Sequence, residues 1–461
     1  MGSGGYLALI NGTEYVWRLE TSDAITHQIK GADFPQTLAP GQTSRVYIEF
    51  EQTLFTPRTD TGAHRRYILE GADDCAFDIL ITDEPPRIRA KFDNFSTPGN
   101  PDGVGFDLGW VHDGSVNSIL SGKQGYFSSN NAPVDWMQKS LRKIGSRPLS
   151  QLCFPGTHEA GMSWDALIDS SLSPTEFTPW TLRQSRNVYG QLLDGSRYLD
   201  IRPVIVDGHL LTGKFHLYHQ SFRFGGCGQG ISEIVNDINR FTAAHKELVL
   251  VNLSHAVNVD ARYRDLNQEE WNTVFEHFSR VHDRFVVSCA EEARCLTKQP
   301  LNRFIGQGRA AVVVMVNAPG IRFGKYEQGF FAPSNVGVRY EGLKTHDWVE
   351  MSQGQLSKLD ILNSTADPRL YRLSWILSPE ISEIVSGAGA LEVVANGACV
   401  KSTPKALAYS ANKALFTECL PRCHAKNIPN ILFVDYLEGR DLAALAMAIN
   451  DRCFPITKPR L

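Results

Sequence analysis

The sequence contains no stretch that approaches the roughly 18 consecutive apolar residues that a membrane-spanning helix needs. It also lacks an excess of one charge, because 46 Lys and Arg residues stand against 50 Asp and Glu residues and leave a formal net charge of −4. Such a balance offers no polycationic surface for nucleic acid. Hydrophobic residues make up 42% of the chain and charged residues 21%, close to the values of soluble globular proteins. The composition excludes a transmembrane or disordered chain, and we expect neither DNA nor RNA as a partner.

No C-x-x-C pair occurs, and the nine cysteines are scattered from Cys75 to Cys453. An odd number of scattered cysteines indicates reduced thiols inside cores rather than a disulfide framework or a zinc site. The first residues, MGSGGYLALINGTEYVW, lack the basic segment of a signal peptide. We therefore expect a cytoplasmic or peripheral membrane protein without cofactor or metal, unless a leader has been removed and the protein is secreted.

The length of 461 residues predicts two or three domains. From about Tyr6 to Ser128 the chain consists of short β-like runs, such as RVYIEFEQTLF and FDILITD, separated by turn sequences such as PGQT and STPGNPDG. Closely spaced strands without a helical period predict an antiparallel β-sandwich. The pattern changes near Asn130, so we predict a β-sandwich over residues 1–130 and a second domain over residues 131–461.

Beyond residue 130, apolar β-like runs alternate with amphipathic helical segments. Apolar residues recur at helical spacing in ISEIVNDINRF (231–241) and EEWNTVFEHFSRV (269–281), so each helix presents one apolar stripe to a sheet. This alternation predicts an α/β fold of the (β/α)8 TIM-like barrel type. The eight candidate strands are LCFPGTH, RYLDIRPVI, FHLYHQ, ELVLVNLSHA, AAVVVMVNAP, NVGVRYEG, LYRLSWILSP and NILFVDYL.

Polar residues follow four of these runs at the point where each strand would end. Taken singly, each has a simpler explanation, because a histidine after a strand is usually a hydrogen-bonded loop residue and D-x-R on one strand face is usually a structural ion pair. Together, two histidines can serve as base and acid, a guanidinium can hold a phosphate, and a carboxylate can fix a histidine tautomer. Because the carboxyl ends of barrel strands face the active-site mouth, we predict phosphoryl-transfer chemistry there. The candidates are His158, Glu159, Asp200, Arg202, His219 and Asp435.

The segments PGTHEAG, QLLDGSRYLDIRP, LYHQSF and FVDYLEG, in this order, resemble the catalytic barrel of phosphatidylinositol-specific phospholipase C. The resemblance implies a phosphoric diester lyase that cleaves an inositol phospholipid to diacylglycerol and inositol cyclic phosphate. It implies that His158 is the general base, His219 the general acid, and Asp435 the group that orients His158. It also implies that Arg202 stabilises charge on the phosphate and that Asp200 positions the neighbouring cations.

Animal members of this family bind Ca²⁺ through an amide beside the first histidine and through acidic residues on the second and fourth strands. This chain has Glu159, Asp200 paired with Arg202, and the sequence LSH at 253–255, which resembles the bacterial, metal-independent pattern. Bacterial members carry an aspartate that assists the acid histidine where this chain has the longer Glu159. The residues that would bind the headgroup align less closely, and the candidates are Arg339, Tyr340, Asp347 and Trp375.

Two segments suggest contact with a phospholipid surface. The insertion SWDALIDSSLSPTEFTPW (163–180) is rich in apolar residues, which either pack internally or insert into a bilayer. The N-terminal region resembles the β-sandwich of aegerolysin-type lipid-binding proteins through NGTEYVW, FPQTLAPGQTSRVYIEF and RRYILEG, so it is a candidate lipid-docking module, with packing or oligomerisation as the alternative. Two other functions stay open: a phosphodiesterase acting on a different phospholipid or a glycosylinositol lipid, and a lipid-binding protein with weak catalysis.

Overall fold

The computed structural model describes residues 3–51, 61–163, 181–218, 222–362, 368–378 and 403–455. The chain divides into two compact units. The first unit contains Met1–Pro133 together with two C-terminal segments, Lys413–Ile428 and Arg440–Leu461, and the second contains Val134–Asn412 and Pro429–Gly439. The C-terminal segments thus belong with the N-terminal strands, which the sequence did not suggest.

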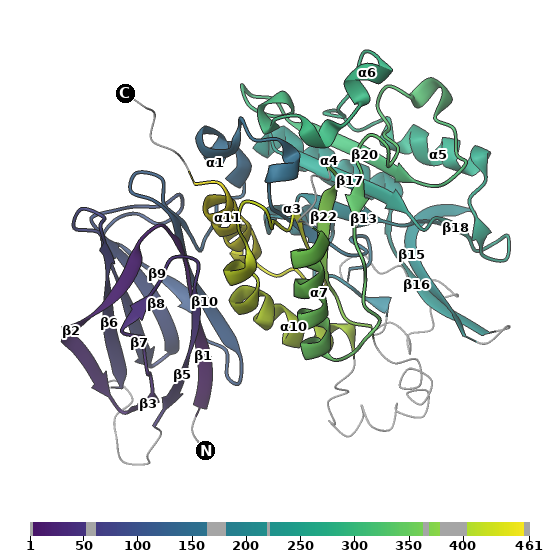
Figure 1. The fold of residues 1–461 in the computed structure, drawn as a ribbon. Helices are drawn as coiled ribbons and strands as arrows, with labels where there is room; N and C mark the ends of the chain where they lie inside the picture. Colours follow the sequence, from purple (N-terminus) through teal and green to yellow (C-terminus); the bar gives the residue numbers. More distant parts are fainter. Residues whose placement is uncertain are drawn as a thin grey trace. The chain divides into compact units, whose positions relative to one another are not determined.

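Two β-sheets form the N-terminal part of the first unit (Figure 1). Their strand orders are β11-β10-β1-β5-β3 and β4-β2-β6-β7-β8-β9. Both sheets contribute to one hydrophobic cluster, in which the ring of Phe77 stacks on Tyr67 at 5.4 Å and meets Trp17 edge-on at 4.8 Å. Buried residues alternate with exposed or partly buried ones along β5 and β8, which directs one face of each sheet into this cluster. The strands are β1 (Ser3–Thr13), β2 (Val16–His27), β3 (Ile29–Gly31), β4 (Thr37–Leu38), β5 (Thr43–Phe50), β6 (Gly62–Glu70), β7 (Ala76–Asp83), β8 (Pro86–Asp93), β9 (Gly105–Gly109), β10 (Ser115–Gly122) and β11 (Ser128–Ser129).

Helix α11 (Asp441–Cys453), near the end of the chain, contacts β1, β10 and β11 of the first sheet. The approach requires a glycine, because a Cβ at Gly12 would lie 2.8 Å from a side chain of α11. The carboxylate of Asp441 accepts hydrogen bonds from the side-chain amides of Asn117 (3.1 Å) and Asn130 (2.8 Å). These bonds join α11 to the N-terminal strands, so the end of the chain completes the first unit.

The second unit contains a seven-stranded sheet with the order β20-β17-β13-β12-β23-β22-β21 (Figure 1). Every neighbouring pair in this sheet is parallel. Seven of the eight candidate strands lie here, which confirms a mixed α/β fold. The strands are β12 (Phe154–Thr157), β13 (Tyr198–Ile201), β17 (Leu248–Ser254), β20 (Ala311–Asn317), β21 (Val338–Arg339), β22 (Leu370–Trp375) and β23 (Ile431–Val434).

The run FHLYHQ is the exception, and its predicted place in the parallel sheet is wrong. Its described residues belong to β15 (His209–Tyr218), which pairs antiparallel with its neighbours, while β13 pairs directly with β17. The reason is the two-residue turn Asp207-Gly208, in which both residues have positive φ (49° and 73°), as hairpin turns require. The separate sheet has the order β16-β15-β14-β18-β19 and contains β14 (Pro203–Val206), β16 (Phe222–Gly230), β18 (Val257–Asn258) and β19 (Arg264–Asp265).

The predicted amphipathic helices are present as α4 (Ile231–His245) and α5 (Gln268–Phe278). Their apolar stripes are buried in one cluster with residues of β17 and β20, which confirms the helical period. No helix in the described ranges is long and apolar enough to cross a membrane. The other helices are α1 (Trp136–Ile144), α3 (Val188–Leu193), α6 (Ala290–Ala293), α7 (Trp348–Leu362) and α10 (Pro404–Glu418).

Candidate active site

Three neighbouring strands of the parallel sheet, β13, β12 and β23, bring candidate residues together at their carboxyl ends. His158 follows β12, Asp435 follows β23, and Arg202 follows β13, in which Asp200 is the third residue. The backbone N–H of His158 donates to the carbonyl of Val434 at 3.0 Å, which extends the strand ladder into the site. Parallel pairing thus joins His158 to a carboxylate 277 residues away in the chain.

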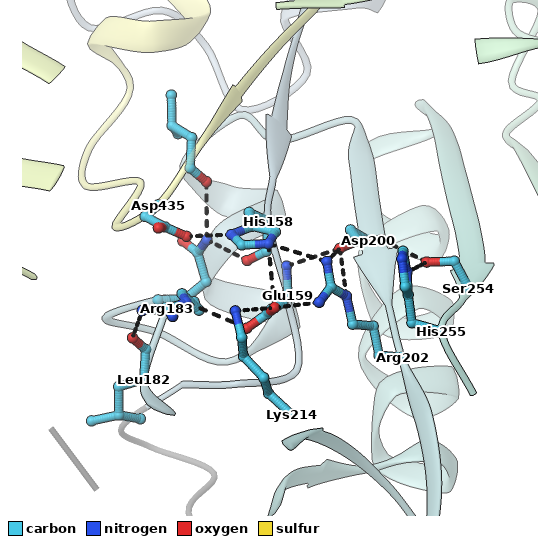
Figure 2. Close-up of polar contacts among 12 residues, drawn as sticks. His158, Glu159, Leu182, Arg183, Asp200, Arg202, Lys214, Ser254, His255 and Asp435 are labelled. Atoms are coloured by element: carbon cyan, nitrogen blue, oxygen red, sulfur yellow. Dashed lines mark hydrogen bonds and ion pairs between the residues drawn. The ribbon is translucent and has the colours of Figure 1, made fainter. Parts of the chain in front are cut away.

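The imidazole of His158 is held on both sides (Figure 2). Nδ1 lies 2.8 Å from Oδ1 of Asp435, and Nε2 lies 3.1 Å from Nη2 of Arg202. An ionised carboxylate only accepts hydrogen bonds, so Nδ1 donates to Asp435. Nε2 lies between Arg202 and Oε1 of Glu159, which is 3.3 Å away, and it is the ring nitrogen that Asp435 leaves available for proton transfer.

Glu159 is buried among positive charges (Figure 2). Its Oε1 lies 2.6 Å from Nζ of Lys214 and also pairs with Arg202, while Oε2 lies 3.4 Å from Nε of Arg183. Burial by itself would raise the pKa of this carboxyl, but Arg202, Lys214 and His158 outweigh that effect and hold its pKa well below the ordinary range. Glu159 is therefore an anion at neutral pH. Next to His158 it pairs with three cations, Arg183, Arg202 and Lys214.

Asp200 accepts hydrogen bonds on both oxygens. Oδ2 receives Nε of Arg202 at 3.1 Å and the backbone N–H of Glu159 at 3.3 Å. Oδ1 receives Nδ2 of Asn252 at 3.2 Å and the hydroxyl of Ser254 at 3.1 Å. Burial opposes ionisation of this carboxyl, but the positive charges led by Arg202 lower its pKa to about 2. Asp200 is thus fully paired and fixes the direction of Arg202.

Three non-glycine residues adopt the left-handed backbone conformation next to the strand ends. They are Glu159 (φ 45°), His255 (φ 51°) and Tyr436 (φ 50°). Side chains with a Cβ rarely adopt this conformation, which costs of order 1 kcal/mol or more. Strained positions of this kind gather at functional sites, and here all three flank the ends of β12, β17 and β23.

Sequence reasoning missed Arg183, Gln184 and Lys214. The amide of Gln184 donates to the carbonyls of His158 (2.9 Å) and Val434 (3.2 Å), so it ties the ends of β12 and β23 together. Burial and the charge of Arg183 lower the pKa of Lys214 to about 8. The sequence feature that could have pointed to Lys214 is its position in the middle of the apolar run that forms β15.

Two predicted features lie outside the described residues. One is His219, the candidate acid, and the other is the apolar insertion with Trp164, Leu167, Phe177 and Trp180. Both stay predictions.

The four candidate headgroup residues have different surroundings. Trp375 is buried and its indole N–H donates to the carbonyl of Ala411 at 2.8 Å, so its ring packs in the interior. Asp347 is exposed and accepts the backbone N–H of Val349 at the start of α7 (2.7 Å). Tyr340 follows Arg339 at the end of β21. The ring of Tyr340 covers the guanidinium of Arg372, with Cζ 3.5 Å from the ring centre.

No protein-family model matches the chain. Among curated proteins, a PI-PLC X domain-containing protein of Dictyostelium discoideum is 27% identical over 163 residues, which cover 33% of this chain and 26% of the relative. The bovine PI-PLC X domain-containing protein 3 is 29% identical over 143 residues, which cover 26% of this chain and 42% of the relative. The chain thus spans less than half the length of either relative.

Solved structures with a similar chain trace include bacterial enzymes. A mutant of the phosphatidylinositol-specific phospholipase C of Staphylococcus aureus is 12% identical, with 70% of this chain and 99% of that chain covered and a TM-score of 0.46. The corresponding protein of Listeria monocytogenes is 13% identical, with 70% and 100% covered and a TM-score of 0.45. The curated relatives confirm what the motifs around His158 and Asp200 indicated: this chain resembles the phosphatidylinositol-specific phospholipase C family.

Proposed function

We propose that the protein is a phosphatidylinositol phospholipase C-like phosphodiesterase that cleaves an inositol phospholipid to diacylglycerol and inositol cyclic phosphate. One observation carries the proposal: Nδ1 of His158 is bonded to Asp435 while the basic Nε2 faces the guanidinium of Arg202. A base next to a phosphate-binding cation is what internal attack on a phosphodiester requires. The curated relatives support the same class of reaction.

In the proposed reaction, Nε2 of His158 takes the proton of the headgroup hydroxyl next to the phosphate. The hydroxyl oxygen forms a bond to phosphorus as the bond from phosphorus to the diacylglycerol oxygen breaks. His219 donates a proton to that leaving oxygen, so the protons balance. Arg202 stabilises the charge that develops on the phosphate. Because the nucleophile belongs to the same molecule, proximity contributes much of the acceleration.

We propose that the reaction requires no metal ion. Arg202 pairs with both Glu159 and Asp200, and Lys214 pairs with Glu159 as well, so these carboxylates are already neutralised. Ca²⁺ takes six to eight oxygen ligands, which this arrangement does not leave available. Among the residues that the structure describes, no group of three or more His, Cys, Asp or Glu side chains is placed to hold a metal ion.

We further propose that the seven-stranded parallel sheet curls into a TIM-like barrel within residues 131–461, and that residues 1–130 form a β-sandwich that docks on lipid. The strand and helix order from β12 to β23 supports the barrel. The hydrophobic cluster shared by the two N-terminal sheets supports the sandwich.

³¹P NMR of products tests the proposal, with vesicles of phosphatidylinositol, a glycosylinositol lipid or phosphatidylcholine in excess EGTA. We expect a cyclic phosphate signal from an inositol lipid, and its loss in His158→Ala and His219→Ala. The exposed His282→Ala serves as the matched control and should behave as the wild-type protein. The absence of cyclic product from every lipid would refute the proposal, and so would full activity of His158→Ala.

A further inference from the structure

Arg202, the proposed phosphate-binding cation, contacts another side chain with each of its nitrogens (Figure 2). Nε donates to Oδ2 of Asp200 at 3.1 Å, Nη1 pairs with Oε1 of Glu159, and Nη2 lies 3.1 Å from Nε2 of His158. The same Oε1 of Glu159 is also 3.3 Å from Nε2 of His158. The proposed reaction brings the phosphate to both Arg202 and His158, so the carboxylate of Glu159 stands where the phosphate must bind.

The other partners of Arg202 are held more firmly in place than Glu159. Asp200 accepts four hydrogen bonds, so its carboxylate is fixed on both oxygens. His158 is fixed by Asp435, whose Oδ1 lies 2.8 Å from Nδ1 of the ring. When a phosphodiester arrives, the contact that must give way is therefore the ion pair between Glu159 and Arg202.

Glu159 has two further counter-ions that do not depend on Arg202. Nζ of Lys214 lies 2.6 Å from Oε1, and Nε of Arg183 lies 3.4 Å from Oε2. The side chain of Glu159 has no exposed surface, and a buried carboxylate without a counter-ion is costly. Lys214 makes the shorter of these two contacts, so it is the group that can keep Glu159 neutralised once Arg202 has turned to another anion.

The charge of Lys214 depends on pH because of its surroundings. Charged groups from three other segments act on it, namely Arg183, Glu159 and Arg202. Burial, and after it the charge of Arg183, lower the pKa of Lys214 to about 8, although Glu159 acts in the opposite direction. Lys214 therefore loses its charge as the pH rises through about 8, whereas the two arginines keep theirs.

We propose that Lys214 is a positioning residue that holds the carboxylate of Glu159 when a phosphodiester displaces it from Arg202. This inference rests on the proposed function, because it assigns a step of substrate binding at the same site. No covalent bond changes in this step. The ion pair between Glu159 and Arg202 is exchanged for one between the phosphate and Arg202, and Lys214 keeps Glu159 neutralised. Without a charge on Lys214, Glu159 stays on Arg202 and repels the phosphate.

Binding of a phosphodiester that cannot react tests the inference. Glycerophospho-2-deoxyinositol lacks the attacking hydroxyl, and titration calorimetry gives its Kd. We expect Lys214→Met to raise this Kd by about 10 to 100 times, the range expected for the loss of a hydrogen bond between charged groups. Lys214→Arg should stay close to the wild-type value, because it keeps the positive charge. The exposed Lys298→Met is the matched control and should bind as the wild-type protein does. An unchanged Kd in a folded Lys214→Met variant would overturn the inference.

A double-mutant cycle shows whether Lys214 acts through Glu159. In Glu159→Gln no negative charge is left to be held, so adding Lys214→Met should cause no further rise in Kd. If the rise persists in the Glu159→Gln background, Lys214 binds the phosphate directly and the positioning role is wrong.

The pH dependence of the same Kd provides a test that does not require Lys214→Met to fold. The charge of a phosphodiester does not change in the alkaline range, so a change in Kd there reports on the protein. The wild-type Kd should rise as the pH passes about 8, whereas that of Lys214→Arg should stay constant. An equal rise in both proteins would overturn the inference.

These binding measurements need no turnover, so they separate the inference from the proposed reaction. Binding that depends on Lys214, without cleavage of any lipid, would support the positioning role and refute the reaction. Cyclic product from the wild-type protein, together with a Kd that does not depend on Lys214, would overturn the inference and leave the reaction standing. If the wild-type protein does not bind the analogue, both are wrong.

Discussion

Replacement of Asp435 by asparagine removes the negative charge next to His158 but keeps the hydrogen bond that orients the imidazole. Arg202 donates to Nε2 of His158 at 3.1 Å, so the tautomer with a proton on Nδ1 is favoured even without the aspartate. In Asp435→Asn the new amide oxygen would accept the same Nδ1 proton, and the amide of Asn412, which donates to the backbone carbonyl of residue 435 at 3.0 Å, would hold the loop as before. The ring keeps its place and loses only its counter-charge.

The size of the effect follows from the charge that forms on the ring during catalysis. When His158 takes a proton it becomes an imidazolium beside Arg202, and Asp435 is the carboxylate at Nδ1, 2.8 Å away. Two unit charges about 4 Å apart interact by about 4 kcal/mol at an effective dielectric constant of about 20. A loss of about 4 kcal/mol in the transition state corresponds to about a 10³-fold loss of kcat. The asparagine amide oxygen can accept the same hydrogen bond from Nδ1, so stability should change little.

Turnover of a soluble inositol phosphodiester measures kcat, and thermal unfolding measures stability. The exposed Asp265→Asn is the matched control on the same unit and should leave both unchanged. Asp435→Ala should lose stability as well as activity, because it leaves Nδ1 of a buried histidine without an acceptor. If Asp435→Asn is folded and keeps more than a tenth of the wild-type kcat, the assignment of His158 and Asp435 as a charge-coupled base is wrong.

Three further perturbations test other parts of the molecule. Wild-type activity should survive excess EGTA, whereas Arg202→Asp should lose activity in the absence of metal. If EGTA abolishes the activity of the wild type and Ca²⁺ restores it, the assignment of Arg202 to the phosphate site is wrong. The pKa of Asp200 is about 2 in the folded protein, against an ordinary 3.8, so its ionised form contributes about 2 kcal/mol of stability above pH 4. This contribution is lost as the pH falls toward 2. Denaturant titrations should therefore show that the stability difference between the wild type and Asp200→Asn shrinks across that range, and a constant difference would refute this expectation. A fragment of residues 131–461 retains Asp441 but lacks Asn117 and Asn130, so we expect it to aggregate or unfold, and a monodisperse fragment with a cooperative melting transition would show that α11 does not need those strands.

The grouping of the candidate site residues was predictable from the sequence because each signal is local. Asp200 and Arg202 are two residues apart, and strand geometry alone places both side chains on one face. His158 and Asp435 each follow an apolar run, so parallel pairing brings them to the same edge of the sheet. The helical spacing of apolar residues in α4 and α5 could likewise be recognised from each segment alone, because each helix must bury one apolar stripe.

Tertiary structure decided the features that depend on partners far apart in the chain. Lys214 meets Glu159 because the turn at Asp207 folds β15 back as a hairpin, and no spacing in the sequence specifies that contact. Arg372 looks like an ordinary strand residue until the structure places its guanidinium over the rings of Tyr340 and Phe433. The same holds for α11, which is buried along almost its whole length and whose sequence does not say which sheet it covers. Hydrophobic period and strand alternation are properties of a segment, whereas a charge acquires its role from the neighbours that folding supplies.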